Sequence, residues 1–175
     1  MIIKPTVLDG IFEIENKKFK DHRGIFVKTF HTQTFKEYGL ESDFKESFYS
    51  VSKKNVLRGM HFQLAPHDHA KLVYVIDGEI LDVAVDIRKE SPTFGKYFST
   101  IISSENAKSL YMIKGFAHGF LTITDTATVV YLISTEHTPE SDSGIKWDSF
   151  GFDWGIDEPI LSGRDNSFVR FESLS

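Results

Sequence analysis

Residues 58 to 72 read RGMHFQLAPHDHAKL, so three histidines, an arginine and a lysine fall within fifteen positions. Histidines at this density serve one of two chemistries. His67 and His69 form an H-x-H pair of the kind that binds a metal ion. Alternatively, a histidine that titrates near neutral pH acts as an acid or a base beside cations that hold an anionic substrate. The proline and the aspartate in this segment mark a turn, so some of these histidines are expected on a surface loop.

Composition narrows the class of protein around this segment. The chain has 175 residues, 41% of them hydrophobic, which predicts one domain spanning residues 1–175. The net charge is −5 and the basic residues form no long run, so no nucleic acid partner is expected. The chain contains no cysteine, which excludes disulfides and thiolate metal sites. The start of the chain lacks a signal-peptide layout and no apolar run could span a membrane, so we expect a cytoplasmic protein without a membrane partner.

The elements that must position these residues are short β strands. Asp77-Gly78 interrupts an apolar stretch, residues 72–87, and this dipeptide predicts a hairpin with a type I′ turn. Only residues 34–38 suggest a helix, and the aromatic tail after Trp147 is expected to wrap over the β core. Many short strands without alternating helices favour an all-β sandwich, jelly roll or small barrel. Further strands are predicted at residues 25–30, 44–50, 56–62, 97–102, 110–113, 119–124 and 128–133.

Six motifs, in order along nearly the whole chain, carry a family resemblance: VLRGMHFQ, KLVYVIDGEILDVAVDIRKESPTFGKY, GFAHGF, VVYLIST, GIKWDS and ILSGRD. Together they resemble the nucleotide-sugar 3,5-epimerases, typified by dTDP-4-dehydrorhamnose 3,5-epimerase. The resemblance implies a cupin-type jelly roll (double-stranded β-helix) with short peripheral helices, a homodimer, and an active site inside the barrel with no metal and no cofactor. It also implies a nucleotide-diphosphate sugar as substrate, in deoxysugar biosynthesis for a surface polysaccharide.

Epimerisation beside a ketone needs a base on one face of the sugar, an acid on the other, and positive charge at the ketone oxygen. His61 of RGMHFQ is the expected base, and the resemblance pairs it with Asp165 of LSGRD, which would stabilise the imidazolium. By the same resemblance Tyr131 of VVYLIS is the acid and Lys71 lies at the C4 oxygen. Nothing in the sequence separates inversion at C3 and C5 from inversion at one carbon alone.

Arg58 and His118 are implied by the resemblance to hold the pyrophosphate. Arg58 and His61 stand an odd number of positions apart, so an ideal strand would point them to opposite faces. Gly59 lies between them and would permit a bulge that brings both side chains into one cavity.

Several residues differ in this chain at the positions that bind the nucleobase in the family. Arg23 and Phe26 of DHRGIFVKTF match the family pattern, whereas four substitutions fall in the expected recognition shell. A protein distinguishes nucleobases by directed hydrogen bonds from its side chains. These changes therefore predict that the substrate carries CDP or GDP in place of dTDP, or that the base is held in another way. The substituted positions are Lys28, Glu46, Phe48 and His137.

Two other classes remain open. His67, His69 and His118 could form the imidazole set of a metal-dependent cupin enzyme, but residues 70–76 supply no carboxylate and Lys71 would put a cation beside the metal. A non-catalytic sugar-nucleotide binding module could share the fold. His69 lies two residues before Lys71 and is expected to contact the substrate if the strand begins that early, whereas His67 is expected on the loop.

Overall fold

Two antiparallel sheets form the body of the computed structural model, which describes residues 1–174. The six-stranded sheet has the order β1-β2-β10-β7-β12-β5, and the five-stranded sheet has the order β13-β6-β11-β8-β9. In the first sheet the strands span Ile2–Pro5 (β1), Ile11–Glu15 (β2), Lys108–Met112 (β10), Lys71–Asp77 (β7), Thr126–Ile133 (β12) and Glu46–Lys53 (β5). In the second they span Asp142–Gly144 (β13), Leu57–Gln63 (β6), Phe116–Thr122 (β11), Glu79–Asp86 (β8) and Tyr97–Ser103 (β9).

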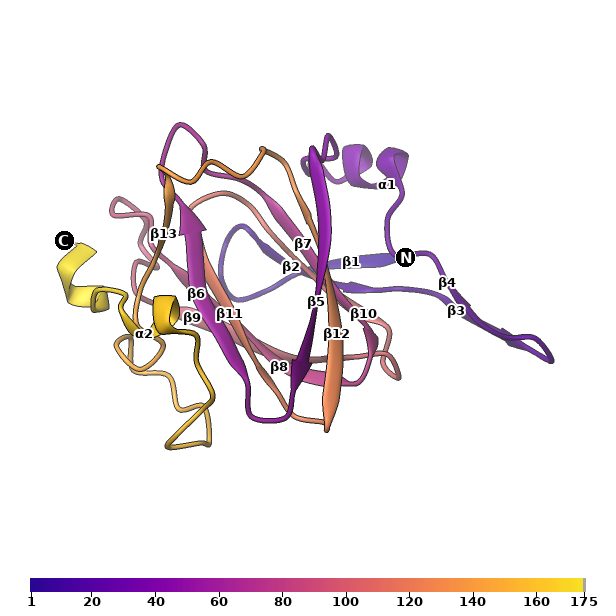
Figure 1. The fold of residues 1–175 in the computed structure, drawn as a ribbon. Coiled ribbons are helices and arrows are strands. Elements are labelled where there is room, and N and C mark those ends of the chain that lie inside the picture. The colour runs from indigo at the N-terminus through magenta and orange to yellow at the C-terminus, as the bar shows by residue number, and fades with distance from the viewer. Residues whose placement is uncertain (175) are drawn as a thin grey trace.

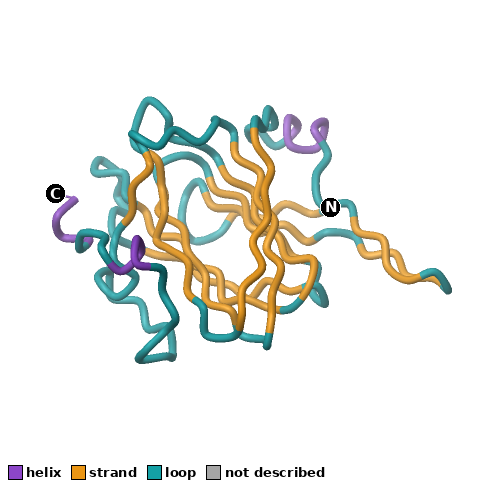
Figure 2. Tube along the Cα trace, viewed as in Figure 1, coloured by secondary structure: helices purple, strands orange, loops and turns teal. Residues whose placement is uncertain are grey.

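The strands wrap around a common interior, and the helices are short segments at the periphery (Figures 1 and 2). Two strands, Lys18–Asp21 (β3) and Gly24–Val27 (β4), form a hairpin that projects from the body (Figure 1). The helical segments are Thr32–Glu37 (α1), Gly163–Asn166 (α2) and Phe171–Leu174 (η1). The all-β prediction of a jelly roll with short peripheral helices is confirmed. No helix within residues 1–174 is long and apolar enough to cross a membrane.

The predicted hairpin at Asp77-Gly78 is wrong. β7 pairs with β10 and β12, whereas β8 pairs with β9 and β11, so the chain crosses from one sheet to the other at Gly78. Gly78 has a φ of 77°, and a Cβ there would lie 2.1 Å from the carbonyl oxygen of Thr126. The glycine is therefore required by the close approach of the β11–β12 turn, and the apolar residues on each side belong to two different sheets.

Apolar side chains from both sheets fill one end of the interior, including Val73, Leu110 and Phe120. The tail covers the outer face of the five-stranded sheet, where Phe150 and Trp154 pack in one cluster with Leu57. The prediction that the tail wraps over the β core is confirmed. This packing leaves the other end of the interior open between β5, β6, β7, β11 and β12.

Candidate active site

A cavity of about 520 Å³ occupies the open end of the interior. Both sheets contribute to its wall, because β5, β7 and β12 belong to one and β6, β11 and β13 to the other. It is lined by Glu46, Phe48, Ser50, Arg58, His61, Phe62, Gln63, His69, Lys71, His118, Phe120, Tyr131, Ile133, His137, Asp142 and Arg164. Most of the residues singled out in the sequence thus converge on one cavity.

A histidine and a carboxylate 104 residues apart in the chain meet at the wall of this cavity. His61 Nε2 lies 2.9 Å from Asp165 Oδ1, and the N–H of Gly59 donates to Asp165 Oδ2 at 3.1 Å. Ser162 caps α2 by accepting a hydrogen bond from the Asp165 N–H at 3.0 Å, which fixes the carboxylate at the start of the helix. The expected pairing of His61 with Asp165 is present, and it uses Nε2 of a histidine that lines the cavity.

Asp165 is only 4% exposed. Burial by itself would raise the pKa of this carboxyl, but the hydrogen bond and charge of His61, with the donors at Gly59 and Ser162, lower it below the usual value. The carboxylate therefore stays ionised and can stabilise a protonated His61.

An irregularity in β6 places Arg58 and His61 in the same cavity. On β11, His118 pairs with His61 and Phe120 pairs with Arg58, so three steps along β6 match two steps along β11. Gly59, at a φ of 143°, lies between them, and a Cβ there would sit 2.6 Å from the Cα of Gly119. The predicted bulge at Gly59 is present. Because of it, Arg58 and His61 face the same side although they stand an odd number of positions apart.

Two buried basic groups lie deep in the cavity. Burial lowers the pKa of Lys71 to about 8, against the opposing effect of Asp82 and Asp142. His118 Nε2 lies 3.0 and 2.9 Å from the two carboxylate oxygens of Asp82. Burial also lowers the pKa of His118, while Asp82 opposes this shift. Lys71 is thus a cation held with little solvation, suited to an oxygen that becomes negative.

Tyr131 stands on β12, on the sheet that faces His61. Its hydroxyl lies 3.3 Å from Ser50 Oγ, and its ring stacks on Phe48 with 4.8 Å between centroids. The ring also meets His118 edge-on. Burial raises the pKa of the Tyr131 phenol. A neutral phenol and an imidazole therefore come from opposite walls of the cavity.

Exposed and partly exposed residues of the lining are joined by hydrogen bonds and ion pairs. The N–H of His137 donates to Glu46 Oε1 at 2.9 Å, and His137 Nε2 lies 3.2 Å from Asp142 Oδ2. Arg164 pairs with the other oxygen of Asp142 at 2.6 Å. Sequence reasoning missed both Asp142 and Arg164. Arg164 precedes Asp165 in LSGRD and could have been found there, whereas no local signal marks Asp142.

Three predicted base-binding residues do not line this cavity. Arg23 and Phe26 stand on the β3–β4 hairpin and Lys28 follows it, on the part of the chain that projects from the body (Figure 1). Arg23 is exposed and pairs with Asp21 at 2.6 Å. Phe26 is 62% exposed. No residue of the hairpin lines the cavity of its own chain.

The three histidines of the metal alternative do not converge. His67 Nδ1 lies 2.8 Å from Ser141 Oγ, outside the cavity lining, while His118 is bound to Asp82. Across residues 1–174, no group of three histidine, cysteine, aspartate or glutamate side chains is placed to hold a metal ion. Of the pair, only His69 lines the cavity, as expected from its position before Lys71.

Comparison with known proteins gives a family. The model described as dTDP-4-dehydrorhamnose 3,5-epimerase matches residues 5–173. Enzymes of that name from Salmonella typhimurium and Methanothermobacter thermautotrophicus are 41% and 44% identical, over 94% and 93% of this chain and 92% and 90% of theirs. A crystal structure of dTDP-6-deoxy-D-glucose-3,5-epimerase from Legionella pneumophila, in complex with dTDP-4-keto-L-rhamnose, superposes with a TM-score of 0.93 at 36% identity, covering 98% of this chain and 93% of that one. The chain therefore belongs to the dTDP-4-dehydrorhamnose 3,5-epimerase family of isomerases.

Proposed function

We propose that this epimerase inverts C3, C5 or both in a dTDP-linked 4-keto-6-deoxy sugar, in deoxysugar biosynthesis for a surface polysaccharide. One observation carries the proposal: His61 with its carboxylate partner and Tyr131 stand on facing sheets of one cavity, with Lys71 buried in the same cavity. A sugar bound between them would present one face to a base and the other to an acid. Inversion needs this arrangement, whereas a binding module does not.

The reaction follows from these positions. His61 Nδ1 takes the proton from the carbon beside the ketone, and Asp165 stabilises the imidazolium that forms. The electron pair of the broken C–H bond moves to the C4 oxygen, where the Lys71 ammonium balances the new negative charge. Tyr131 then returns a proton to the opposite face of the carbon. His61 releases the proton that it took to solvent, and Tyr131 recovers one from solvent.

The two ends of the substrate require different partners. Arg58 and Arg164 line the cavity as cations and suit the pyrophosphate. His118 is only 3% exposed, bound to Asp82 and in contact with the Tyr131 ring. We therefore assign His118 to the sugar end, in place of the pyrophosphate role implied by the resemblance.

Uptake of solvent deuterium tests the reaction. Wild-type protein in D₂O is expected to place deuterium at C3 or C5 of the 4-keto-6-deoxy sugar, and His61→Ala should abolish this uptake because the base is lost. NMR of the recovered sugar reads both results and also separates one inversion from two. If wild-type protein shows no uptake with dTDP-, CDP- or GDP-linked sugars, the epimerase assignment fails and a binding module takes its place.

Glu46 favours a second candidate for the nucleotide. Its carboxylate belongs to a residue that lines the cavity and can only accept hydrogen bonds, which matches the amino groups of cytosine and guanine. Phe48 and His137 stand beside it at positions where the resemblance implies other side chains. CDP or GDP is the nucleotide this candidate requires, and a competition among dTDP, CDP and GDP distinguishes it. A clear preference for dTDP would reject it.

We propose a homodimer in which the β3–β4 hairpin reaches the cavity of a second copy. The hairpin carries exposed apolar side chains, among them Phe19, Ile25 and Phe26, and its Arg23 lies outside the cavity of its own chain. Mixed dimers test this: co-expressed Arg23→Ala and His61→Ala chains should regain activity that neither variant has alone, because one cavity then has both groups intact. A monomer by light scattering, or no recovery, would contradict the proposal.

A further inference from the structure

The side-chain amide of Gln63, at the end of β6, has only one possible orientation. Gln63 Oε1 accepts a hydrogen bond from the backbone N–H of Thr138 at 2.7 Å. On the other side, Gln63 Nε2 donates to the carbonyl oxygens of His67 at 2.8 Å and Glu136 at 3.3 Å. A backbone N–H can only donate and a backbone carbonyl can only accept, so these contacts assign the amide oxygen and nitrogen without ambiguity.

This orientation determines which nitrogen of His69 carries the proton. Gln63 Nε2 has two hydrogens: the His67 carbonyl takes one at 2.8 Å, and the Glu136 carbonyl and His69 Nδ1, each at 3.3 Å, share the other. The amide nitrogen can only donate, so in this contact Nδ1 accepts. The His67 carbonyl would favour a proton on the ring, but it already accepts from Gln63 Nε2 and from Thr135 Oγ1 at 2.9 Å. Both lone pairs of that carbonyl are engaged, so the proton of His69 belongs on Nε2.

The surroundings of His69 also determine its charge. Burial, with the Lys71 ammonium on β7 and His118 on β11, lowers the pKa of His69 to about 3. Asp142 on β13 and the His67 carbonyl act in the opposite direction and are outweighed. At neutral pH the ring is therefore a neutral imidazole with a single N–H.

The local backbone places the His69 side chain on the same side as Lys71. The N–H of Ala70 donates to Ser134 Oγ and the carbonyl of Ala70 accepts from the Ser134 N–H, so the pairing of β7 with β12 continues one residue before Lys71. Ala70 packs in the apolar cluster with Leu72. His69 and Lys71 flank it on the opposite side, and both line the cavity.

We infer that His69 is a further catalytic residue, a neutral imidazole whose Nε2–H, fixed in direction by the Gln63 amide, donates a hydrogen bond to the same sugar oxygen that Lys71 stabilises. The inference rests on the proposed epimerisation, because that oxygen gains charge only when a neighbouring proton is removed. A neutral donor fits beside Lys71, since a second cation there would repel the ammonium and a carboxylate would repel the enolate. Gln63 is the positioning residue that acts through His69.

Nitrogen NMR tests the tautomer without any substrate. In wild-type protein labelled with ¹⁵N-histidine, the His69 ring is expected to show protonated Nε2 and unprotonated Nδ1 from pH 5 to 8. Gln63→Glu replaces the donating amide nitrogen with an acceptor, so the proton of His69 should move to Nδ1. A wild-type ring that carries its proton on Nδ1, or that is cationic at pH 6, would overturn the inference.

Kinetics test the catalytic part. His69→Leu removes the donor at similar volume and should lower kcat about 100-fold with little change in KM, because the hydrogen bond strengthens only as charge develops. His69→Gln restores an N–H near the position of Nε2 and should recover most of that loss. An unchanged kcat in His69→Leu, with the fold verified by thermal melting, would reject the role.

The two proposals fail in different ways. If wild-type protein takes up no deuterium, the epimerase assignment fails, whereas the NMR result still reports the state of His69. If uptake is normal and insensitive to His69→Leu, the epimerase assignment stands and the role of His69 is rejected.

Discussion

At the scale of single residues, this site depends on the environment that each side chain meets. Asp165 keeps its charge despite burial because His61, Gly59 and Ser162 all donate to it or balance it. Tyr131 keeps its proton because it is buried. The neutral Tyr131 can thus donate a proton, while the ionised Asp165 stabilises the protonated form of His61, the base on the facing sheet.

Asp165→Asn is expected to lower kcat by about 100- to 10,000-fold, because an amide leaves the shape intact but cannot balance a protonated His61. Initial rates and thermal melts measured on the same preparations check this. Asp153→Asn, an exposed carboxylate of the same tail, is the control and should be unchanged. Similar rates in both variants would remove Asp165 from the mechanism.

Tyr131→Phe should separate proton removal from inversion. His61 can still remove the proton and return it to the same face, so deuterium exchange should persist while formation of the inverted product falls by about 100-fold or more. NMR of the sugar reads exchange and stereochemistry in one sample. Equal loss of both would assign Tyr131 to binding or packing.

Lys71 predicts a pH limit. With its pKa lowered to about 8, the ammonium loses its proton as the pH rises through this value, and the enolate then loses its charge partner. We expect kcat to fall above about pH 8, whereas the Tyr131 phenol, with its raised pKa, keeps its proton in this range. A Lys71→Arg variant should move the fall to higher pH, because arginine stays charged. A fall at the same pH in that variant would assign it to another group.

At the scale of elements, the site depends on how closely β6 and β11 approach. The bulge that turns both Arg58 and His61 inward exists because Gly59 faces Gly119, with no side chain between the strands. A Cβ on Gly119 would lie 2.6 Å from Met60 Sδ and 2.8 Å from the Arg58 carbonyl oxygen. The two glycines therefore act as a pair, each requiring the other.

Gly59→Ala should destabilise the protein by about 1–3 kcal/mol or more, because the alanine meets both a strained φ and the backbone of β11. Activity should fall further than stability, since His61 and Arg58 would be displaced. Gly151 is the matched control: it has a φ of 78°, but a Cβ there would meet nothing within 4 Å. Chemical denaturation measures the loss in free energy of unfolding for both variants. If Gly59→Ala and Gly151→Ala lose the same amount, the close approach of the strands is not what requires the glycine.

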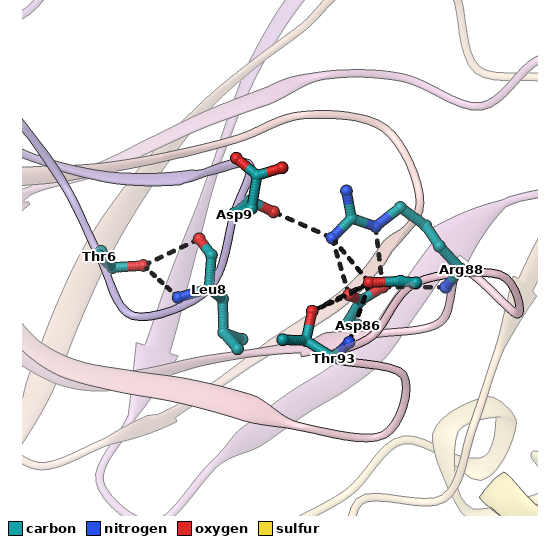
Figure 3. A network of polar contacts seen from close by, with 7 residues as sticks. Thr6, Leu8, Asp9, Asp86, Arg88 and Thr93 are labelled. Atoms are coloured by element: carbon teal, nitrogen blue, oxygen red, sulfur yellow. Dashed lines mark hydrogen bonds and ion pairs between the residues drawn. The ribbon is translucent and has the colours of Figure 1, made fainter.

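At the scale of the whole molecule, one buried carboxylate ties together segments far apart in the chain (Figure 3). Asp86 accepts hydrogen bonds from Arg88, Ser91 and Thr93, and Arg88 donates in turn to the Asp9 carbonyl at 2.9 Å. The Arg88 guanidinium also lies 4.6 Å from the centre of the Phe116 ring, at the start of β11. The network thus fixes the loop at Asp9, between β1 and β2, and the β8–β9 connection against β11.

Asp86→Asn is expected to lower the free energy of unfolding by roughly 3 kcal/mol, because it removes the charge of a fully buried carboxylate and leaves the partly buried Arg88 without its charge partner. Burial by itself would raise the pKa of Asp86, but the Arg88, Ser91 and Thr93 hydrogen bonds lower it to about 2. The stabilisation is therefore present above about pH 4, where the unfolded carboxyl is ionised, and is lost as the pH falls towards 2.

Denaturation at pH 7 and pH 3 measures this dependence. The difference between wild type and Asp86→Asn should shrink at the lower pH. Asp21→Asn breaks an exposed pair with Arg23 and serves as the control, with a smaller effect at both values. A wild-type advantage that grows on acidification would contradict the assignment.

The prediction of the hairpin at Asp77-Gly78 shows the limit of local patterns for the fold. The flanking strands were predicted in the right places, but a dipeptide that suits a tight turn also suits a crossing between sheets. Strand partners are chosen by packing with distant residues, which a local pattern does not contain. The same limit explains why Asp142 was missed: it reaches the site only because β13 pairs with β6.

The sequence alone determined the β-rich class and His61 as a candidate base, because these follow from residue types and local spacing, and the resemblance of its motifs to a family added Asp165, Tyr131 and Lys71. Tertiary structure decided which of them meet. It joined His61 to Asp165 across 104 positions, turned Arg58 into the same cavity, and placed Arg23 on a hairpin outside it. It also set the direction of the His69 N–H through Gln63. These contacts depend on pairing between distant strands and on burial. Both are set by residues far apart in the sequence, so no short segment of the chain predicts them.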